Sequence, residues 1–197
     1  MSHYFINDKD LKDDLKKLDF SFHGNQFAFL SNSGMFSKDH VDPASIELIE
    51  TVPPLSGSLL DMGCGYGCIG IALAKAYGLK LTQADINEAA LALAEKNCQT
   101  NGVKSELIKS DCFESVSGLF DTIAINPPIH AGKSVTYKMY EDSVKHLVPG
   151  GKLYVVTFKK HGAESTKEKL AQVYGNCETL RKKKGCYVFC CEKEGLQ

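Results

Sequence analysis

The sequence lacks the features that would place it in several large classes of protein. No apolar run approaches the roughly 20 residues that a bilayer-spanning helix requires, so we expect no membrane segment. The N-terminal stretch MSHYFINDKDLKDDLKK is polar and charged, without the apolar region of a secretory signal peptide. Internal repeats and low-complexity linkers are also missing. These absences predict one soluble, cytoplasmic, globular domain in the 197 residues.

Metal-binding spacing is missing too, although the chain contains eight cysteines. No CxxC or CxxH pair of the kind that marks a zinc site is present. Without a secretory signal, the cysteines are expected in a reducing compartment. We therefore predict reduced, mostly buried thiols and no bound metal.

A large net charge is also absent, since the chain contains 23 Lys and Arg and 24 Asp and Glu residues. This argues against a protein that coats nucleic acid through bulk charge. The charges are unevenly spread: residues 1–100 hold 8 basic against 13 acidic residues, and residues 101–197 hold 15 against 11. The basic excess includes Lys159-Lys160-His161 and Arg181-Lys182-Lys183-Lys184. Such runs are more often solvated surface, but this polarity also suits a protein that presents one face to phosphate.

What the sequence does contain is a regular alternation of short apolar strands and helices. The stretch FSFHGNQFAFLSN predicts a β-hairpin, and Asp42 followed by Pro43 marks the start of a helix over residues 42–52. The strands predicted after that helix are SLLDMG, LKLTQADI, SELIKSD, FDTIAIN and KLYVVTF. The helices predicted between them are CIGIALAKAYG, NEAALALAEKNCQTNG, residues 137–147 and residues 164–174, and CETLRKKK with CYVFCCEK predicts a closing hairpin.

This order predicts an α/β fold with a Rossmann-like, doubly wound, mostly parallel seven-stranded sheet. A C-terminal antiparallel hairpin and a small N-terminal β-hairpin extension complete it. We divide the single domain 1–197 into an extension, residues 1–52, and a core, residues 53–197. Ligands of such sheets bind at the carboxyl ends of the strands. Asp61, Asp85, Asp111 and Asn126 stand at strand ends and are therefore expected to converge on one edge.

A glycine loop follows the first core strand in LLDMGCGYGCIGIALA. Residues 65–70 match the dinucleotide pattern GxGxxG, and Asp85 lies 20 residues beyond Gly65, where a ribose-binding acid is expected. A nicotinamide or flavin enzyme is therefore an open alternative. Three features favour S-adenosylmethionine (SAM). Asp61 would repel a pyrophosphate but suits the ammonium group of a methionine moiety, Asp111 can accept from an adenine amine, and a terminal hairpin is typical of methyltransferase sheets.

The strand FDTIAIN stops abruptly at Asn126, and Pro127 and Pro128 cannot continue a sheet ladder. A turn at a sheet edge would explain this locally. A chemical explanation is a clamp for an NH₂ group, in which Asn126 offers its side-chain carbonyl and Pro127 its backbone carbonyl. Two acceptors that hold both hydrogens of a conjugated amine favour sp³ geometry and the charge that develops on nitrogen. From this stretch alone the turn is favoured, and the clamp becomes the better explanation only with the other motifs of the chain.

LLDMGCGYGCIGIALA, ADINEAALALAEKNCQTNG and AINPPIHAG together resemble class I SAM-dependent methyltransferases that methylate amines. Upstream, FLSNSGMFSKDHVD is similar to the segment that opens the catalytic (methyltransferase small) domain of bacterial small-subunit ribosomal RNA guanine-N2 methyltransferases. The resemblance runs from about Phe27 to the final strand. It implies methylation of a guanine exocyclic amine in 16S ribosomal RNA, with the small ribosomal subunit or its RNA as partner.

The resemblance also implies roles for individual residues. The methionine end of SAM would be held at Asp61, Gly63, Gly65 and Gly67, the ribose at Asp85 with Ile86, and the adenine at Asp111 and Cys112. The catalytic clamp would be formed by Asn126, Pro127 and Pro128. Asn126 would also border the cofactor. Substrate contacts would come from Phe36, Ile129 and His130.

These substrate contacts have simpler explanations. Ile129 stands where many relatives carry Phe or Tyr, so it would cover a base by apolar contact only. Phe36, which would help to cover the cofactor, is more simply explained as a core residue. His130 can equally be a surface or turn residue.

Other functions remain open from the sequence. A protein glutamine N5-methyltransferase would use the same clamp, but such enzymes typically follow Asn-Pro-Pro with Tyr and carry a helical N-terminal domain. A methyltransferase of another RNA, a dinucleotide-dependent oxidoreductase and a non-catalytic RNA-binding relative are further alternatives, and the intact Asn126 motif disfavours the last. The ribosomal RNA enzymes often carry a second, degenerate methyltransferase-like domain. We do not expect one in these 197 residues, so no target nucleotide is predicted.

Overall fold

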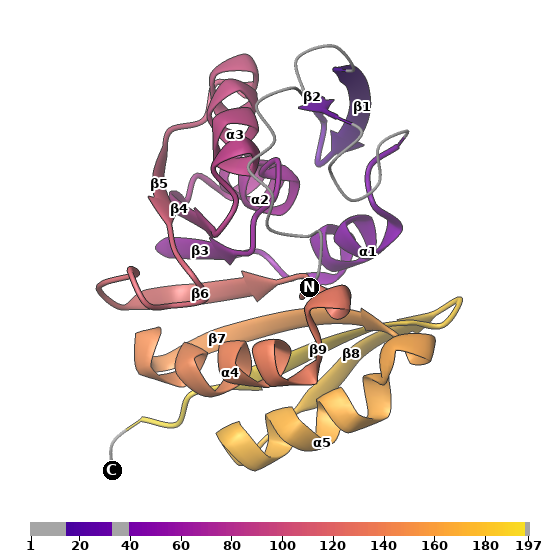
Figure 1. Cartoon of the computed structure of the whole chain (residues 1–197), viewed down its shortest axis with the longest axis vertical. Coiled ribbons are helices and arrows are strands. Elements are labelled where there is room, and N and C mark those ends of the chain that lie inside the picture. Colours follow the sequence, from indigo (N-terminus) through magenta and orange to yellow (C-terminus); the bar gives the residue numbers. More distant parts are fainter. Residues whose placement is uncertain (1–14, 33–39, 196–197) are drawn as a thin grey trace.

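A seven-stranded sheet forms the centre of the computed structural model, which describes residues 15–32 and 40–195 (Figure 1). Its strand order is β5-β4-β3-β6-β7-β9-β8. The five strands from β5 to β7 in this order are parallel, and β9 runs antiparallel to both its neighbours. The strands are β3 (Ser58–Met62), β4 (Lys80–Asp85), β5 (Ser105–Lys109), β6 (Phe120–Ile125), β7 (Leu147–Phe158), β8 (Glu178–Lys183) and β9 (Cys186–Glu192). The predicted sheet is confirmed.

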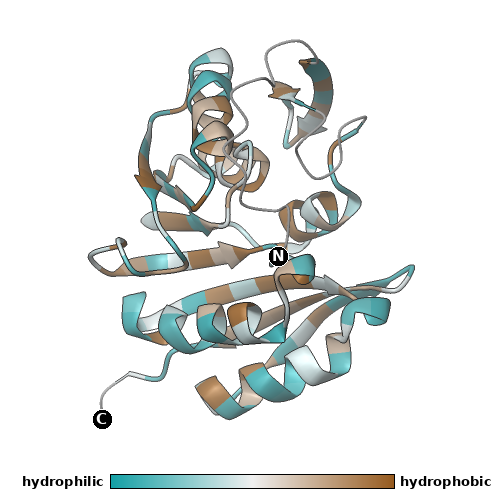
Figure 2. Ribbon diagram, viewed as in Figure 1, coloured by the Kyte–Doolittle hydropathy of each residue, from teal (hydrophilic) through white to brown (hydrophobic). Residues whose placement is uncertain are grey.

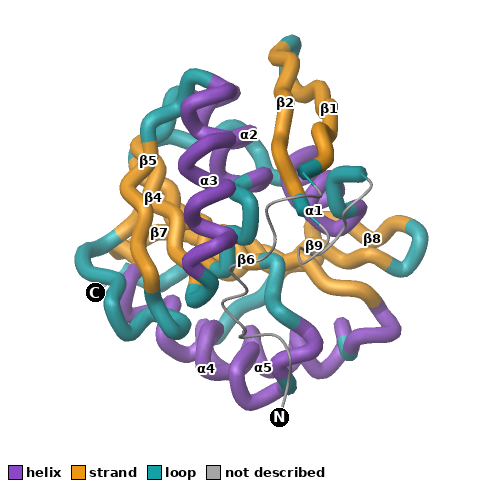
Figure 3. The backbone as a smooth tube through the Cα atoms, turned by 45° about the horizontal axis from the view of Figure 1, so that its top comes forward, coloured by secondary structure: helices purple, strands orange, loops and turns teal. Residues whose placement is uncertain are grey.

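Helices cover both faces of this sheet, which explains why its central strands are apolar at consecutive positions. On one face lie α1 (Pro43–Thr51), α2 (Cys68–Tyr77) and α3 (Glu88–Asn101). On the other lie α4 (Lys133–Ser143) and α5 (Ala163–Tyr174), as Figure 3 shows. Each face has its own hydrophobic cluster. Figure 2 shows apolar residues along the strands, whereas polar residues cover much of α4 and α5.

Two helix starts confirm the capping residues expected from the sequence. The Asp42 carboxylate accepts from the backbone N–H of Ser45 at 2.9 Å, at the start of α1. At the start of α3, the Asn87 side chain accepts from the backbone N–H of Ala89 at 2.9 Å. These contacts fix both helix ends at the edge of the sheet where the strands terminate.

The helix predicted over residues 137–147 was misplaced, because α4 runs from Lys133 to Ser143. Its N-cap, Gly132, has a φ of 93° and no side chain to mark a helix start. The Pro149-Gly150-Gly151 segment, expected to end that helix, instead lies within β7. It occupies the place where the register between β6 and β7 shifts, so the missing N–H of Pro149 breaks no regular ladder.

The N-terminal hairpin, β1 (Lys16–Phe22) and β2 (Asn25–Ser31), packs against α2 and α3. The free edge of β2 is paired with asparagine side chains of α3. Asn101 Oδ1 accepts from Ala28 N at 3.1 Å and its Nδ2 donates to Ala28 O at 2.9 Å. Asn97 pairs in the same way with Leu30, at 2.7 and 3.0 Å. The two amides, one helical turn apart, thus replace a third strand.

Other expectations can be compared with the described residues. Six of the eight cysteines are buried, which confirms the prediction of mostly buried cysteine side chains. Within residues 15–32 and 40–195, no helix is long and apolar enough to cross a membrane. The same residues contain no group of three or more His, Cys, Asp or Glu side chains that could hold a metal. Phe36 and the rest of residues 33–39, which carry much of the similarity described for FLSNSGMFSKDHVD, lie outside the described residues.

Candidate active site

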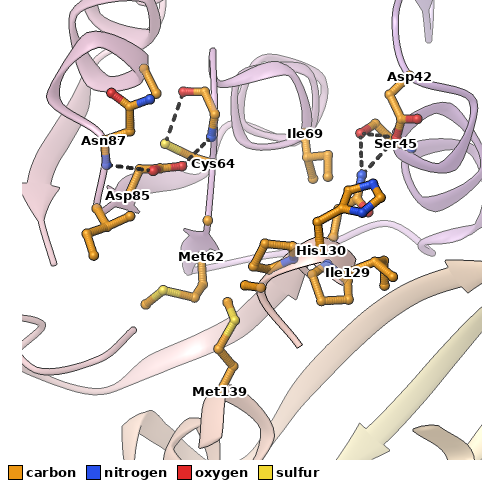
Figure 4. A pocket seen from close by; sticks show the side chains of 18 of the residues that line it. Asp42, Ser45, Met62, Cys64, Ile69, Asp85, Asn87, Ile129, His130 and Met139 are labelled. Atoms are coloured by element: carbon orange, nitrogen blue, oxygen red, sulfur yellow. Dashed lines mark hydrogen bonds between the residues drawn. The ribbon is translucent and has the colours of Figure 1, made fainter. Parts of the chain in front are cut away.

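A cavity of about 710 Å³ opens at the carboxyl ends of the parallel strands, where the sequence predicted a ligand site (Figure 4). This volume falls in the range of small-molecule and cofactor sites. Residues after β3, β4, β5, β6 and β7 all contribute to its wall. In Figure 4, Asp85 and Asn87 lie at one end and Asp42 and Ser45 at the other, with Met62 and Met139 between them.

Two glycines of the glycine loop bring bare backbone to the cavity, beside the side chains of Cys64 and Tyr66. Gly63 and Gly65 line it with φ values of 71° and 56°. A Cβ at Gly65 would meet no atom within 4 Å, so any side chain there would take up space in the cavity. Gly67 does not line the cavity, and a Cβ there would come within 2.7 Å of the Gln83 Nε2 atom. Gly67 therefore serves packing, whereas Gly63 and Gly65 allow close approach of a ligand.

Asp61 lies behind the loop and not on the cavity wall, which differs from its expected place beside a ligand. The side chain is only 1% exposed. Its Oδ2 atom accepts from Gly70 N at 2.8 Å, at the start of α2. Burial raises the pKa of Asp61 to about 6, against the opposing effect of the Gly70 N–H. In this structure Asp61 ties the first turn of α2 to the end of β3.

Asp85 ends β4 and lines the cavity as predicted. Its two oxygens accept from Gly65 N at 2.8 Å and from Asn87 N at 2.9 Å. Burial raises its pKa, while these N–H donors favour the charged form. The carboxylate thus joins the glycine loop to the start of α3 and still borders the cavity.

The other residues expected at the cofactor also line the cavity. Ile86 follows Asp85, and Asp111 and Cys112 follow β5. Asp111 is exposed at the rim, whereas Cys112 is buried with a φ of 49°. Burial raises the pKa of Cys112 to about 11, so this side chain is a neutral thiol at pH 7. All the predicted cofactor residues therefore line the cavity except Asp61 and Gly67, which lie behind its wall.

Asn126 follows β6, lines the cavity and is held in one orientation by α1. Its Nδ2 atom donates to Asp42 Oδ2 at 2.8 Å and to Ser45 Oγ at 3.0 Å (Figure 4). Because an ionised carboxylate only accepts hydrogen bonds, the nitrogen of the amide must face Asp42. The Oδ1 atom is therefore the atom of this amide that can accept from a substrate.

The residues after Asn126 continue the wall of the cavity. Pro127, Pro128, Ile129 and His130 all line it, and a short 3₁₀ helix, Ile129–Ala131, carries the last two. His130 is exposed. A second histidine, His161, joins the rim from the far side, and its pKa is lowered by burial, by Lys160 and by His130.

Several cavity residues were not recognised from the sequence as part of the site, among them Asp42, Ser45, Thr157 and His161. Asp42 was interpreted only as a helix cap, and Ser45 had no assigned role, yet both contact Asn126 across more than 80 positions of sequence. Thr157, at the end of β7, and His161, which follows β7, also line the cavity. The cap pattern gave the start of α1, but nothing local shows which strand end it faces.

Comparison with known proteins identifies the family. A family model described as the methyltransferase small domain matches residues 26–190. Protein YbxB of Bacillus subtilis, described as uncharacterized, is 37% identical over 97% of this chain and 98% of its own length. Ribosomal RNA small subunit methyltransferase C of Vibrio vulnificus is 35% identical over 82% of this chain and 48% of that protein.

A solved structure agrees with these sequence matches. The T. thermophilus 16S rRNA N2 G1207 methyltransferase (RsmC), in complex with AdoMet and guanosine, superposes with a TM-score of 0.82. It is 26% identical, and the match covers 93% of this chain and 52% of that one. The chain thus spans about half the length of the ribosomal RNA methyltransferases it matches.

Two cofactors were left open by the glycine loop, a dinucleotide and SAM. The match covers most of the chain, including the loop, Asp85 and the Asn-Pro-Pro segment. The chain therefore belongs to the methyltransferase small domain family, which confirms the prediction of a SAM-dependent methyltransferase.

Proposed function

We propose that the chain methylates the exocyclic amine N2 of a guanine in 16S ribosomal RNA, using SAM. The observation that carries this proposal is the fixed orientation of Asn126, whose amide nitrogen is held by Asp42 and Ser45. An acceptor fixed in this way suits a substrate NH₂ group. The names of the relatives support guanine N2 and ribosomal RNA as the substrate class.

The cavity fits the proposed cofactor in size and in the polar groups that line it. SAM supplies a methyl group already activated by its sulfonium. Gly63 and Gly65 would let the methionine part approach the backbone, and Asp85 would accept from the ribose hydroxyls. Asp111 and Cys112 would border the adenine. Asp61 would act through the loop, since Gly70 N already occupies its Oδ2 atom.

The clamp would act on the two hydrogens of the amine. Asn126 Oδ1 and Pro127 O would each accept one, and Pro128 would limit the freedom of the segment. This holds the lone pair in position for an in-line displacement and favours positive charge on nitrogen. Asp42 is a positioning residue here, because it contacts the Asn126 amide and stabilises its orientation.

The basic residues of the two runs, 159–160 and 181–184, divide into two groups. Arg181 and Lys183 pair with Glu47 on α1, at 2.7 and 2.9 Å, and so brace that helix. Lys159, Lys160, Lys182 and Lys184 are exposed. Lys159 N donates to Gly185 O at 2.7 Å, which places the segment after β7 beside the β8–β9 turn. We propose that these four lysines face the phosphates of the RNA.

The test is transfer of labelled methyl from SAM to isolated small ribosomal subunits and to naked ribosomal RNA, followed by nucleoside analysis. Label in N2-methylguanosine is the expected result, and comparison of the two substrates shows which form the enzyme prefers. Label in another nucleoside would overturn the guanine assignment. No label in either RNA, with SAM still bound, would favour another RNA or a protein amide.

A further inference from the structure

A buried hydroxyl without a hydrogen-bond partner lies on the cavity wall at the end of β7. Thr157 lines the cavity and is only 2% exposed. Its Oγ1 atom has no partner among the described residues. A buried polar group in this state lowers the stability of the fold, so it calls for an explanation. One explanation is a ligand that supplies the missing hydrogen-bond partner.

The sheet order places Thr157 on the side of Asn126 away from the cofactor residues. Those residues follow β3, β4 and β5, Asn126 follows β6, and Thr157 lies in β7 beyond it. Val155 pairs with Ile125, so Thr157 lies beside the chain where it leaves the sheet at Asn126 and Pro127. Adjacent strands are about 4.8 Å apart, which is comparable with the length of the hydrogen-bonding edge of a purine.

We propose that Thr157 is a specificity-determining residue that hydrogen-bonds the N1–O6 part of the guanine edge whose N2 amine is held at Asn126. A hydroxyl can accept from N1–H or donate to O6. Phe158 and His161, which also line the cavity, close it on the same side. This inference rests on the proposed function and adds to it the contact that recognises the rest of the base.

The structure offers matched variants. Thr157→Val keeps the shape of the side chain and removes the hydroxyl, whereas Thr157→Ser keeps the hydroxyl. Ser31→Ala is the control for stability, because Ser31 is fully buried, its Oγ has no partner in the part of the chain that the structure describes, and it does not line the cavity. We would record thermal unfolding without ligand. We would then titrate guanosine or inosine into protein saturated with S-adenosylhomocysteine, by calorimetry.

Thr157→Val and Ser31→Ala should both unfold a few degrees above the parent, because each removes an unpaired buried hydroxyl. Only Thr157→Val should weaken guanosine binding, by about 5- to 10-fold. Inosine lacks the amine but keeps N1–H and O6, so Thr157→Val should weaken it by the same factor. Asn126→Ala should weaken the binding of guanosine but not that of inosine. Thr157→Ser should bind both nucleosides nearly as tightly as the parent does.

Guanosine binding by Thr157→Val equal to that of the parent would overturn the contact. If Thr157→Val binds guanosine more weakly but inosine as well as the parent does, the hydroxyl contacts the amine instead. If the variant binds S-adenosylhomocysteine more weakly, the hydroxyl contacts the cofactor. Either result overturns the proposal. If the parent binds S-adenosylhomocysteine but neither nucleoside, the guanine assignment itself falls. That outcome is distinguishable because it appears in the parent rather than in the variant.

Discussion

The two halves of the cavity are built in different ways. The cofactor half, after β3, β4 and β5, presents the backbone of Gly63 and Gly65 and the Asp85 carboxylate, which accepts from Gly65 N and Asn87 N. The amine half, after β6 and β7, presents side chains whose partners come from a distant helix, as Asn126 does with Asp42 and Ser45. A backbone cradle fits a cofactor common to many reactions, whereas side chains can change with the substrate. Variants on the two sides should therefore separate binding of SAM from activation of the amine.

The largest effect is expected at Asn126. Asn126→Ala removes one of two proposed acceptors for the amine, so kcat should fall by about 10²- to 10³-fold. Binding of S-adenosylhomocysteine, measured by calorimetry, should stay close to that of the parent. A folded variant that no longer binds this cofactor product would contradict the division of the cavity into halves.

Asp85→Ala should show the opposite pattern. The change removes a charged acceptor from the cofactor half and frees the N–H groups of Gly65 and Asn87. We expect about 10- to 100-fold weaker binding of S-adenosylhomocysteine, the equivalent of one or two charge-assisted hydrogen bonds. At saturating SAM, kcat should recover most of its parental value. A low kcat at saturation would show that Asp85 acts on more than binding.

Asp42 tests whether orientation of Asn126 matters. Asp42→Ala removes an acceptor for Asn126 Nδ2, and we expect kcat to fall about 10-fold with S-adenosylhomocysteine affinity unchanged. Asp42→Asn keeps an oxygen in the same place and the helix cap, so it should restore most of the rate. Ser45→Ala leaves Asp42 in place and should cost less. Equal losses in the Ala and Asn variants would point to the charge rather than to orientation.

The smallest effect on catalysis and cofactor binding is expected at Asp61, where the change affects the stability of the fold. Its pKa is raised by burial from 3.8 to about 6, so the folded protein binds this proton more tightly than the unfolded chain. This contribution to stability is complete below about pH 4 and is lost as pH rises through 6. Asp61→Asn has no such titration. Its free energy of unfolding relative to the parent should rise by up to roughly 3 kcal/mol from pH 4 to pH 7.

Urea unfolding of both proteins at a series of pH values measures this difference. A difference that does not vary with pH would exclude Asp61 as the titrating group. Affinity for S-adenosylhomocysteine should change much less than in Asp85→Ala, because Asp61 does not line the cavity.

The sequence predicted the parts of the site that depend on where strands end. Asp85 and Asn126 could be placed at one edge, because parallel strands bring their carboxyl ends together. The same reasoning placed Asp61 near a ligand, but a strand end has an inner and an outer side, and Asp61 faces the loop from behind. The roles of Asp42 and Thr157 depend on how α1 and β7 pack beside β6. Such contacts between distant segments leave no local pattern.

The paired asparagines of α3 have a consequence for how the chain behaves among its own copies. An open strand edge is a template on which another chain can add a strand. Asn97 and Asn101 hydrogen-bond the outward backbone amide and carbonyl groups of Leu30 and Ala28, respectively. No strand of another chain can pair with that part of the β2 edge. Asn97 also donates to Tyr66 O in the glycine loop, at 2.8 Å. Asn97 thus both blocks strand addition at the hairpin edge and links the hairpin to the cofactor half.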